Sequence, residues 1–355
     1  MPLLGHQSRG EARLRKLRLI IVGLLGVLCL TGIGLYTYGR ARPAAPAAPG
    51  NVQAHDPSMI KQGHTYYVFA TGGTIQIRKS TNLVSWELAG TVFDRIPDWI
   101  TKAVGTIPDL WAPDISYFNG KYHLYYAGSH FGTNNSVIGL ATNTTLDPGS
   151  RDYHWVDEGM VIDSLPASDN WNAIDPNLSF DSTGVPWLAW GSFWSGIKMR
   201  RLDLNTGKLS TVDQKLYALA SRGGGAIEAP AILAHDGYYY LFVSFDRCCA
   251  GANSTYRIMV GRSTTITGPY LDSTGTSMLS GGGDQLLASY DNVHGPGGQS
   301  VYVDGQTTWL VHHYYDALAN GAITLQIRKL TWTNEHWPHV AAPYKPSPGI
   351  FGFFL

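Results

Sequence analysis

The fold class that the sequence predicts is all-β, a five-bladed β-propeller, and three observations lead to it. A short motif that contains a proline occurs five times, at intervals of 56, 63, 54 and 66 residues. A turn and then an aromatic or β-branched segment follow each motif, and both are typical of strands. Beyond residue 50, no long segment has the apolar periodicity of a helix. The five prolines are Pro57, Pro113, Pro176, Pro230 and Pro296.

Each repeat is long enough for four short strands, which is the size of one propeller blade. The segments predicted as strands after the motifs are residues 63–69, 120–126, 185–190, 237–242 and 306–311. A single blade cannot bury both of its faces, so five blades stacked in a ring would supply the core and leave few open edges. A β-sandwich whose strands resemble one another by chance is the alternative, and five ordered repeats favour the propeller.

The first 50 residues have a different character. Residues 1–18 form a basic segment with five basic residues and one acidic residue, which predicts that this end stays in the cytoplasm. Residues 19–38 are uncharged and apolar, and at about 1.5 Å per residue they could cross a hydrocarbon core of about 30 Å. We therefore predict a transmembrane anchor with the remainder of the chain outside the cell. A cleaved signal peptide is the alternative, because a Pro/Ala linker over residues 39–50 follows directly.

Composition agrees with one compact β domain over residues 51–355. The chain has 41 glycines, which suit many turns, and its 11 Trp, 20 Tyr and 11 Phe suit either sheet packing or stacking on sugars. The formal net charge is zero and no basic stripe appears in this domain, so nucleic acid is not an expected partner. An exported domain could hold a disulfide between the adjacent Cys248 and Cys249, although two free thiols are the alternative.

In three of the five motifs an acidic residue stands before the proline, namely Asp56, Asp175 and Glu228. Repeats in a closed ring would bring these acids together near its axis. Hydrolysis of a glycosidic bond needs one carboxyl to protonate the leaving oxygen and a second to activate water or to attack carbon. Each acid might instead only cap a turn, because Asp-Pro is a common turn pair. Three acids at corresponding places in three repeats favour catalysis.

The ordered series of motifs resembles glycoside hydrolase family 43, and within it the endo-acting α-1,5-L-arabinanases. The resemblance covers about residues 51–350, and the series as a whole is more specific than any one motif. The motifs are residues 55–58, 111–114, 173–177, 191–197, 226–230 and 313–316. The resemblance implies an enzyme that hydrolyses internal α-1,5-L-arabinofuranosidic bonds in arabinan. We expect it to be secreted or membrane-anchored, and to be a monomer.

The same resemblance implies a role for each acid. Family 43 enzymes invert the anomeric centre, so Asp56 would be the general base and Glu228 the general acid. Asp175 would orient Glu228 and raise its pKa, because a nearby negative charge disfavours ionisation. Inversion implies that the carboxyls of Asp56 and Glu228 lie about 6.5–9.5 Å apart, with room for a water molecule.

The resemblance also makes His313 a candidate ligand of a calcium-type ion held largely by water. A hard cation prefers oxygen ligands, so a core histidine satisfied by hydrogen bonds is the alternative. His312, next to it on a predicted strand, would point to the opposite face.

Sugar contacts are expected from Trp111, Phe193 and Trp194, whose rings could pack on the apolar faces of a furanose, and from Asn177 beside the acids. Packing in the core is the alternative for the aromatic residues. The chain departs from the family at Gly298, where many arabinanases have histidine. This departure leaves the acids in place but makes specificity less certain. An α-L-arabinofuranosidase, a β-xylosidase and a non-catalytic carbohydrate-binding propeller are the alternative functions.

Overall fold

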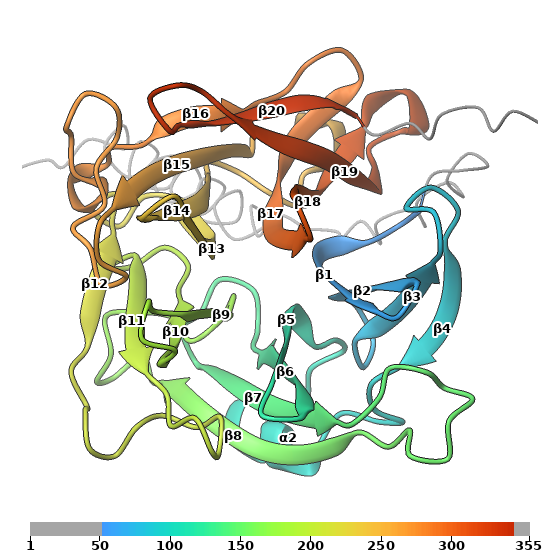
Figure 1. Ribbon diagram of the computed structural model, residues 1–355. Coiled ribbons are helices and arrows are strands. Elements are labelled where there is room, and N and C mark those ends of the chain that lie inside the picture. Colours follow the sequence, from blue (N-terminus) through green and yellow to red (C-terminus); the bar gives the residue numbers. More distant parts are fainter. Residues whose placement is uncertain (1–51, 344–355) are drawn as a thin grey trace, which may run out of the picture. The chain divides into compact units, whose positions relative to one another are not determined.

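The computed structural model describes residues 52–343, and these form five antiparallel sheets of four strands each, arranged in a ring (Figure 1). The prediction of a five-bladed β-propeller is confirmed. In the described residues each sheet is built from four consecutive strands, so no strand is exchanged between the first and last blades to close the ring. One short helix, α2 (Asp98–Val104), lies between the first and second blades in the sequence.

The strands of each blade follow one another outward from the axis. The first blade holds β1 (His55–Gln62), β2 (Thr65–Thr71), β3 (Gln76–Ser80) and β4 (Glu87–Thr91). The second holds β5 (Trp111–Phe118), β6 (Lys121–Gly128), β7 (Ser136–Asn143) and β8 (Val156–Ser164). The third holds β9 (Asn177–Phe180), β10 (Pro186–Trp190), β11 (Ile197–Arg201) and β12 (Tyr217–Ala220).

The remaining two blades complete the ring. The fourth holds β13 (Ile227–His235), β14 (Tyr238–Phe245), β15 (Arg257–Ser263) and β16 (Asp284–Leu287). The fifth holds β17 (Val293–Asp304), β18 (Thr307–Asp316), β19 (Ala322–Trp332) and β20 (Pro338–Pro343). Three single turns of 3-10 helix lie in loops, namely η1 (Gly251–Asn253), η2 (Met278–Ser280) and η3 (Ala317–Ala319).

The proline motif is a distortion at or just before the innermost strand of each blade. The residue before each proline has a left-handed backbone, with φ between 42° and 56°, in all five repeats. Four of the innermost strands also shift their register around this point. Such a bulge re-aims side chains, and proline fits there because it has no N–H to donate to a ladder. The five left-handed residues are Asp56, Ala112, Asp175, Ala229 and Gly295.

Hydrogen bonds across the ring follow the same repeat. The side chain just after the proline accepts from a backbone N–H of the next blade in three consecutive repeats. Ile115 N donates to Ser58 Oγ at 3.1 Å, Leu178 N donates to Asp114 Oδ2 at 2.8 Å, and Ile232 N donates to Asn177 Oδ1 at 2.9 Å. These bonds give a partner to amide groups of the innermost strands, each of which is the edge strand of its sheet.

Other contacts join the fifth blade to its two neighbours. Gln299 Nε2 donates to the carbonyl of Ala229 at 2.6 Å, which links the fifth blade to the fourth. On the other side, the backbone N–H of Asp56 donates to His313 Nδ1 at 3.1 Å. Side chains therefore take part in closing the ring, and one of them, His313, belongs to the candidate site.

Five hydrophobic clusters among the described residues each lie between two adjacent blades. Neighbouring residues of one strand contribute to different clusters: Val68 packs toward the fifth blade and Phe69 toward the second. Both are fully buried, because each blade has a neighbour on both faces. This two-sided burial explains the uninterrupted apolar runs after each proline motif.

Within residues 52–343, no helix is long and apolar enough to cross a membrane. The predicted basic segment, anchor and linker over residues 1–50 lie outside the described residues.

Candidate active site

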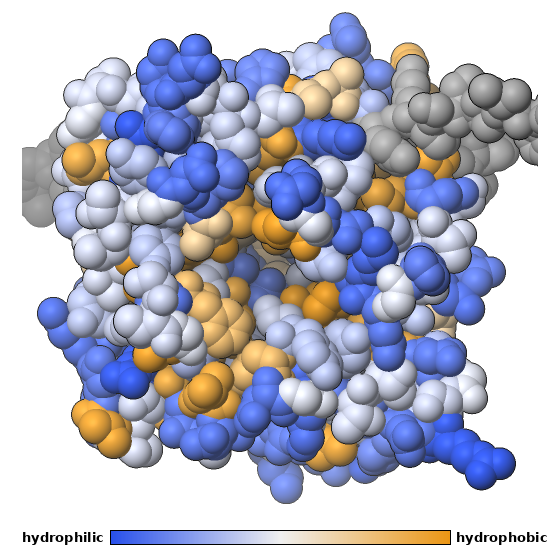
Figure 2. Space-filling model, in the orientation of Figure 1, coloured by the Kyte–Doolittle hydropathy of each residue, from blue (hydrophilic) through white to orange (hydrophobic). Residues whose placement is uncertain are grey.

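The acidic residues of the motifs lie at one end of the ring, where the innermost strands begin. Figure 2 shows one of the two faces of the ring, which is hollowed at its centre. A cavity at the acidic residues is lined by Asp56, Asp114, Asp175, Asn177 and Gly298, together with neighbouring residues of all five motifs. Asp56 and Asp175 occupy the same position, immediately before proline, whereas Glu228 stands one residue earlier in its motif. The structure thus brings the predicted acids to one place.

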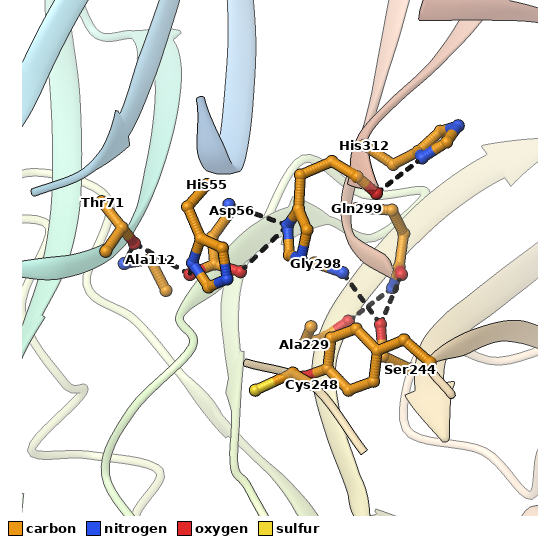
Figure 3. A network of polar contacts seen from close by, with 12 residues as sticks. His55, Asp56, Thr71, Ala112, Ala229, Ser244, Cys248, Gly298, Gln299 and His312 are labelled. Carbon is orange, nitrogen blue, oxygen red and sulfur yellow. Dashed lines mark hydrogen bonds and ion pairs between the residues drawn. The ribbon is translucent and has the colours of Figure 1, made fainter. Parts of the chain in front are cut away.

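Asp56 is held by both of its carboxylate oxygens (Figure 3). Oδ2 accepts from Thr71 Oγ1 at 2.8 Å and lies 2.7 Å from His55 Nδ1, and Oδ1 lies 3.5 Å from His313 Nδ1. The Thr71 hydroxyl also accepts from Ala112 N at 2.8 Å, so its proton is directed at Asp56. Burial alone would raise the pKa of Asp56, but His55, His313 and Thr71 lower it to about 2. Asp56 is therefore ionised at neutral pH.

Glu228 has hydroxyl partners instead of imidazoles. Oε2 accepts from Ser192 Oγ at 2.6 Å, and Oε1 accepts from the Tyr256 hydroxyl. Burial raises the pKa of Glu228; the Ser192 bond and the positive charge of His55 oppose the increase, and the negative charge of Asp56 adds to it. The resulting pKa is about 7, so a substantial fraction of Glu228 carries a proton at neutral pH.

Asp175 contacts the backbone next to Glu228. Its Oδ2 accepts from Ala229 N at 3.0 Å, which fixes the peptide that follows Glu228. Burial, the charge of Glu228 and the charge of Asp56 together raise the pKa of Asp175 well above its usual range. The site therefore combines an ionised carboxylate with two carboxyls that resist ionisation, and this is the combination that acid–base catalysis at one bond requires.

His313 is fully buried, and its two ring nitrogens have different surroundings. Nδ1 accepts from the backbone N–H of Asp56, whereas Nε2 is buried without a partner among the described residues. Burial and the charge of His55 hold the pKa of His313 well below its usual range, so the ring is neutral and carries its proton on Nε2. A cation needs a lone pair at that atom. The hydrogen bonding of His313 therefore does not fit direct coordination of a calcium-type ion through Nε2, and no catalytic step below depends on an ion.

The residues predicted to bind substrate lie in three different settings. Phe193 is 39% exposed in the loop between β10 and β11, and Trp194 beside it is half-buried. Trp111 is half-buried and packs on the apolar cluster between the second and third blades. Asn177 is buried in the hydrogen bonds between blades. Their contacts with sugar remain predictions.

Sequence reasoning did not single out several side chains that hold the acids. Ser192 and His55 stand inside motifs that the family resemblance rests on, so their positions were visible although their contacts were not. Thr71 ends β2, and Tyr256 precedes β15, at 28 residues from Glu228 in the sequence. Only the three-dimensional fold places Thr71 and Tyr256 beside an acid.

Gly298 occupies a crowded position. Its φ is +56°, and a Cβ built there would lie 2.3 Å from Asp56 Oδ1 and 2.7 Å from His313 Nδ1. Any side chain at this point would have to displace the Asp56 carboxylate or the imidazole. The glycine that replaces the expected family histidine is therefore matched to the present arrangement of Asp56 and His313.

A family model described as "Glycosyl hydrolases family 43" matches residues 49–338. The chain belongs to glycosyl hydrolase family 43. Family membership agrees with the resemblance of the motifs, and the matched residues include almost all of the described propeller.

The chain is also similar to named extracellular proteins and to a solved structure. An extracellular endo-α-(1→5)-L-arabinanase of Bacillus subtilis is 47% identical over 311 residues, which are 86% of this chain and 93% of that protein. An extracellular exo-α-(1→5)-L-arabinofuranosidase of Cellvibrio japonicus is 41% identical over 300 residues, 81% of this chain and 86% of that protein. The crystal structure of an exo-1,5-α-L-arabinanase from a bovine ruminal metagenomic library superposes with a TM-score of 0.79 at 44% identity, over 82% of this chain and 98% of that one.

Proposed function

We propose that this protein is an exported endo-1,5-α-L-arabinanase that hydrolyses internal α-1,5-L-arabinofuranosidic bonds of arabinan with inversion. The observation that carries the proposal is the difference between two carboxyls in one cleft, with a pKa of about 2 for Asp56 and about 7 for Glu228. Family membership and relatives that act on α-1,5-linked arabinose support the choice of substrate.

In the proposed reaction, a water molecule lies between Asp56 and the anomeric carbon. Asp56 accepts a proton from this water as its oxygen bonds to that carbon, and Glu228 donates its proton to the leaving oxygen. Thr71 and His55 hold the Asp56 carboxylate, and Ser192 and Tyr256 hold Glu228. After turnover Asp56 is protonated and Glu228 is ionised, and exchange with solvent restores both.

Asp175 acts on Glu228 in two ways in this mechanism. It fixes the Ala229 peptide, and whenever Asp175 is ionised its negative charge opposes the ionisation of Glu228, because the repulsion between two carboxylates is mutual. Both effects keep a proton on the general acid until the glycosidic bond breaks.

Product analysis tests the proposal. The full-length protein and a Glu228→Ala variant are incubated with linear arabinan, branched arabinan, xylan and aryl glycosides, and the products are separated. Short arabino-oligosaccharides from linear arabinan, absent with the variant, are the expected result. Arabinose alone would identify an exo-acting enzyme, and xylose would identify a β-xylosidase. Binding to polysaccharide without cleavage would identify a carbohydrate-binding propeller and contradict the proposal.

Export is supported by the two extracellular relatives, and we propose that residues 19–38 either anchor the monomeric enzyme or act as a cleaved signal. N-terminal sequencing of the protein from membrane and medium fractions distinguishes the two fates. Light scattering on the purified protein tests the monomer.

The calcium-type ion at His313 remains a separate prediction. The family resemblance predicts one ion per chain, whereas the hydrogen bond that His313 Nδ1 accepts predicts no direct ligand. Elemental analysis before and after dialysis against a chelator, with thermal unfolding measured on both samples, decides between these expectations.

A further inference from the structure

Cys248 and Cys249 form a disulfide in the loop between β14 and β15, which settles the alternative that the sequence left open. This loop begins beside the catalytic acid, because Glu228 pairs with Ser244 near the end of β14. Cys248 is half-buried and Cys249 is exposed. Cys249 Sγ lies 3.9 Å from His55 Nε2, so the disulfide is close to the candidate site, and no step of the proposed mechanism uses it.

A short series of contacts leads from this disulfide to the Asp56 carboxylate. The backbone N–H of Cys249 donates to the Tyr315 hydroxyl at 2.8 Å. The same hydroxyl lies 3.1 Å from His55 Nε2, and His55 Nδ1 lies 2.7 Å from Asp56 Oδ2. Cys249 Sγ is itself 3.9 Å from His55 Nε2. Cys249 of the fourth blade and Tyr315 of the fifth blade thus hold His55 of the first blade.

Global stabilisation does not explain the disulfide. A disulfide lowers the conformational entropy of the unfolded chain by an amount that grows with the logarithm of the length of the loop it closes. A bond between adjacent residues closes almost no loop, so this stabilisation is small. What it restricts is the local backbone. Cys249 has φ of 63°, a left-handed conformation that residues other than glycine rarely adopt. This conformation aims the Cys249 N–H at Tyr315.

The surroundings of Tyr315 and His55 leave little freedom for other arrangements. Tyr315 is 2% exposed, so its hydroxyl has few alternative partners. The His55 ring stacks on His313, with the ring centres 4.0 Å apart and the planes at 25°. The His55 ring is thus fixed by stacking on His313 and by Asp56 at Nδ1. A change at Cys249 would act on its third contact, the one between Nε2 and the Tyr315 hydroxyl.

We propose that the Cys248–Cys249 disulfide positions the Asp56 carboxylate, acting through the hydrogen bonds of Tyr315 and His55. The proposal rests on the function proposed above, in which Asp56 is the general base. Without the bond, Cys249 can leave the left-handed conformation, its N–H turns away from Tyr315, and His55 loses its fixed orientation. The expected consequence is a slower chemical step with little change in substrate affinity.

Reduction of the folded wild-type protein is the first test. A water-soluble phosphine and water convert the disulfide into two thiols, and the phosphine becomes its oxide, so atoms and electrons balance. Alkylation and mass spectrometry confirm that Cys248 and Cys249 are reduced. We expect kcat on arabinan to fall on the order of 10-fold, since misplacing a catalytic group by about 1 Å can cost up to 100-fold. KM and the midpoint of thermal unfolding should stay nearly constant.

Three variants test the route. The Cys248→Ser/Cys249→Ser double variant should match the reduced protein, and Tyr315→Phe should lower kcat to a similar extent because it removes the hydroxyl between Cys249 and His55. Combining the two changes should cost little more than either alone, since they interrupt the same series of contacts. Tyr270→Phe is the matched control: it also removes a buried tyrosine hydroxyl bond, to Ile266 O at 2.7 Å, in the loop between β15 and β16, and should leave kcat unchanged.

Asp56→Asn, measured in the same assay, separates the two proposals. If Asp56→Asn is inactive while the reduced protein retains full kcat, the disulfide has no positioning role and the proposed function stands. If Asp56→Asn retains activity, the proposed function itself is wrong. Additive effects of the double cysteine variant and Tyr315→Phe would also overturn the proposed route.

Discussion

The two sides of the cleft share one backbone motif, yet the pKa of the carboxyl is lowered on one side and raised on the other. Asp56 belongs to the first blade and Glu228 to the fourth, and both stand at a bulge beside a proline. The partners of Asp56 include two imidazoles, His55 and His313, whereas Glu228 contacts two hydroxyls and lies near other acids. Both residues are half-buried, and the loss of water around each carboxyl pushes both pKa values upward. The neighbours, and not the burial, decide which carboxyl becomes the base and which the acid.

The largest expected effect comes from removing each carboxyl in turn. Asp56→Asn and Glu228→Gln should each lower kcat on arabinan by a factor on the order of 10²–10⁴, the usual contribution of a general base or acid. On an aryl arabino-oligosaccharide, whose leaving group needs no proton, Glu228→Gln should recover much of its activity and Asp56→Asn should not. Equal losses for the two variants on both substrates would show that the two sides do not have separate roles.

The next largest effect is expected at Gly298, which lies against the general base Asp56. Gly298→Ala places a methyl group against Asp56 and His313, and we expect kcat to fall on the order of 10- to 100-fold as the carboxylate moves. Gly305→Ala is the matched control, because Gly305 has nearly the same φ, +60°, but no atom within 4 Å of the added carbon. Both variants should lose about 1 kcal/mol of unfolding free energy from backbone strain. Only Gly298→Ala should lose activity.

Much of the site was visible in the sequence because the motif repeats. The spacing of the prolines predicted five blades. The three acids in the repeated motifs predicted that their carboxyls would meet near the axis of the ring. Only the fold shows that Asn177 carries a hydrogen bond between blades, since its partner Ile232 is 55 residues away. The contact of Tyr256 with Glu228 is equally non-local. Sequence periodicity gives the position of a residue along a strand, but the partners of a buried side chain depend on which neighbouring blade faces it.

A smaller effect is expected on the pH dependence of kcat/KM, which the general acid Glu228 controls. Glu228 must be protonated to act, so kcat/KM should fall as the pH rises through about 7, whereas Asp56, with a pKa of about 2, should limit activity only in strong acid. Asp175→Asn removes a carboxyl that can ionise but keeps an oxygen for the Ala229 N–H. We expect it to move the alkaline limb about one pH unit lower. An unchanged limb in a pH profile would show that Asp175 acts only by orientation.

The smallest effect compares a single hydroxyl on each side. Ser192 lowers the pKa of Glu228 by donating to its ionised form, so Ser192→Ala should move the alkaline limb of kcat/KM to higher pH, by less than about one unit. Thr71 does the same for Asp56, but the pKa of Asp56 remains far below neutral when one of several partners is lost. Thr71→Val should therefore leave the alkaline limb where it is, and any loss of kcat should be the same at every pH above about 5. An alkaline limb that moves in Thr71→Val would mean that the two carboxyls titrate as one unit, and the contrast between the base side and the acid side would then fail.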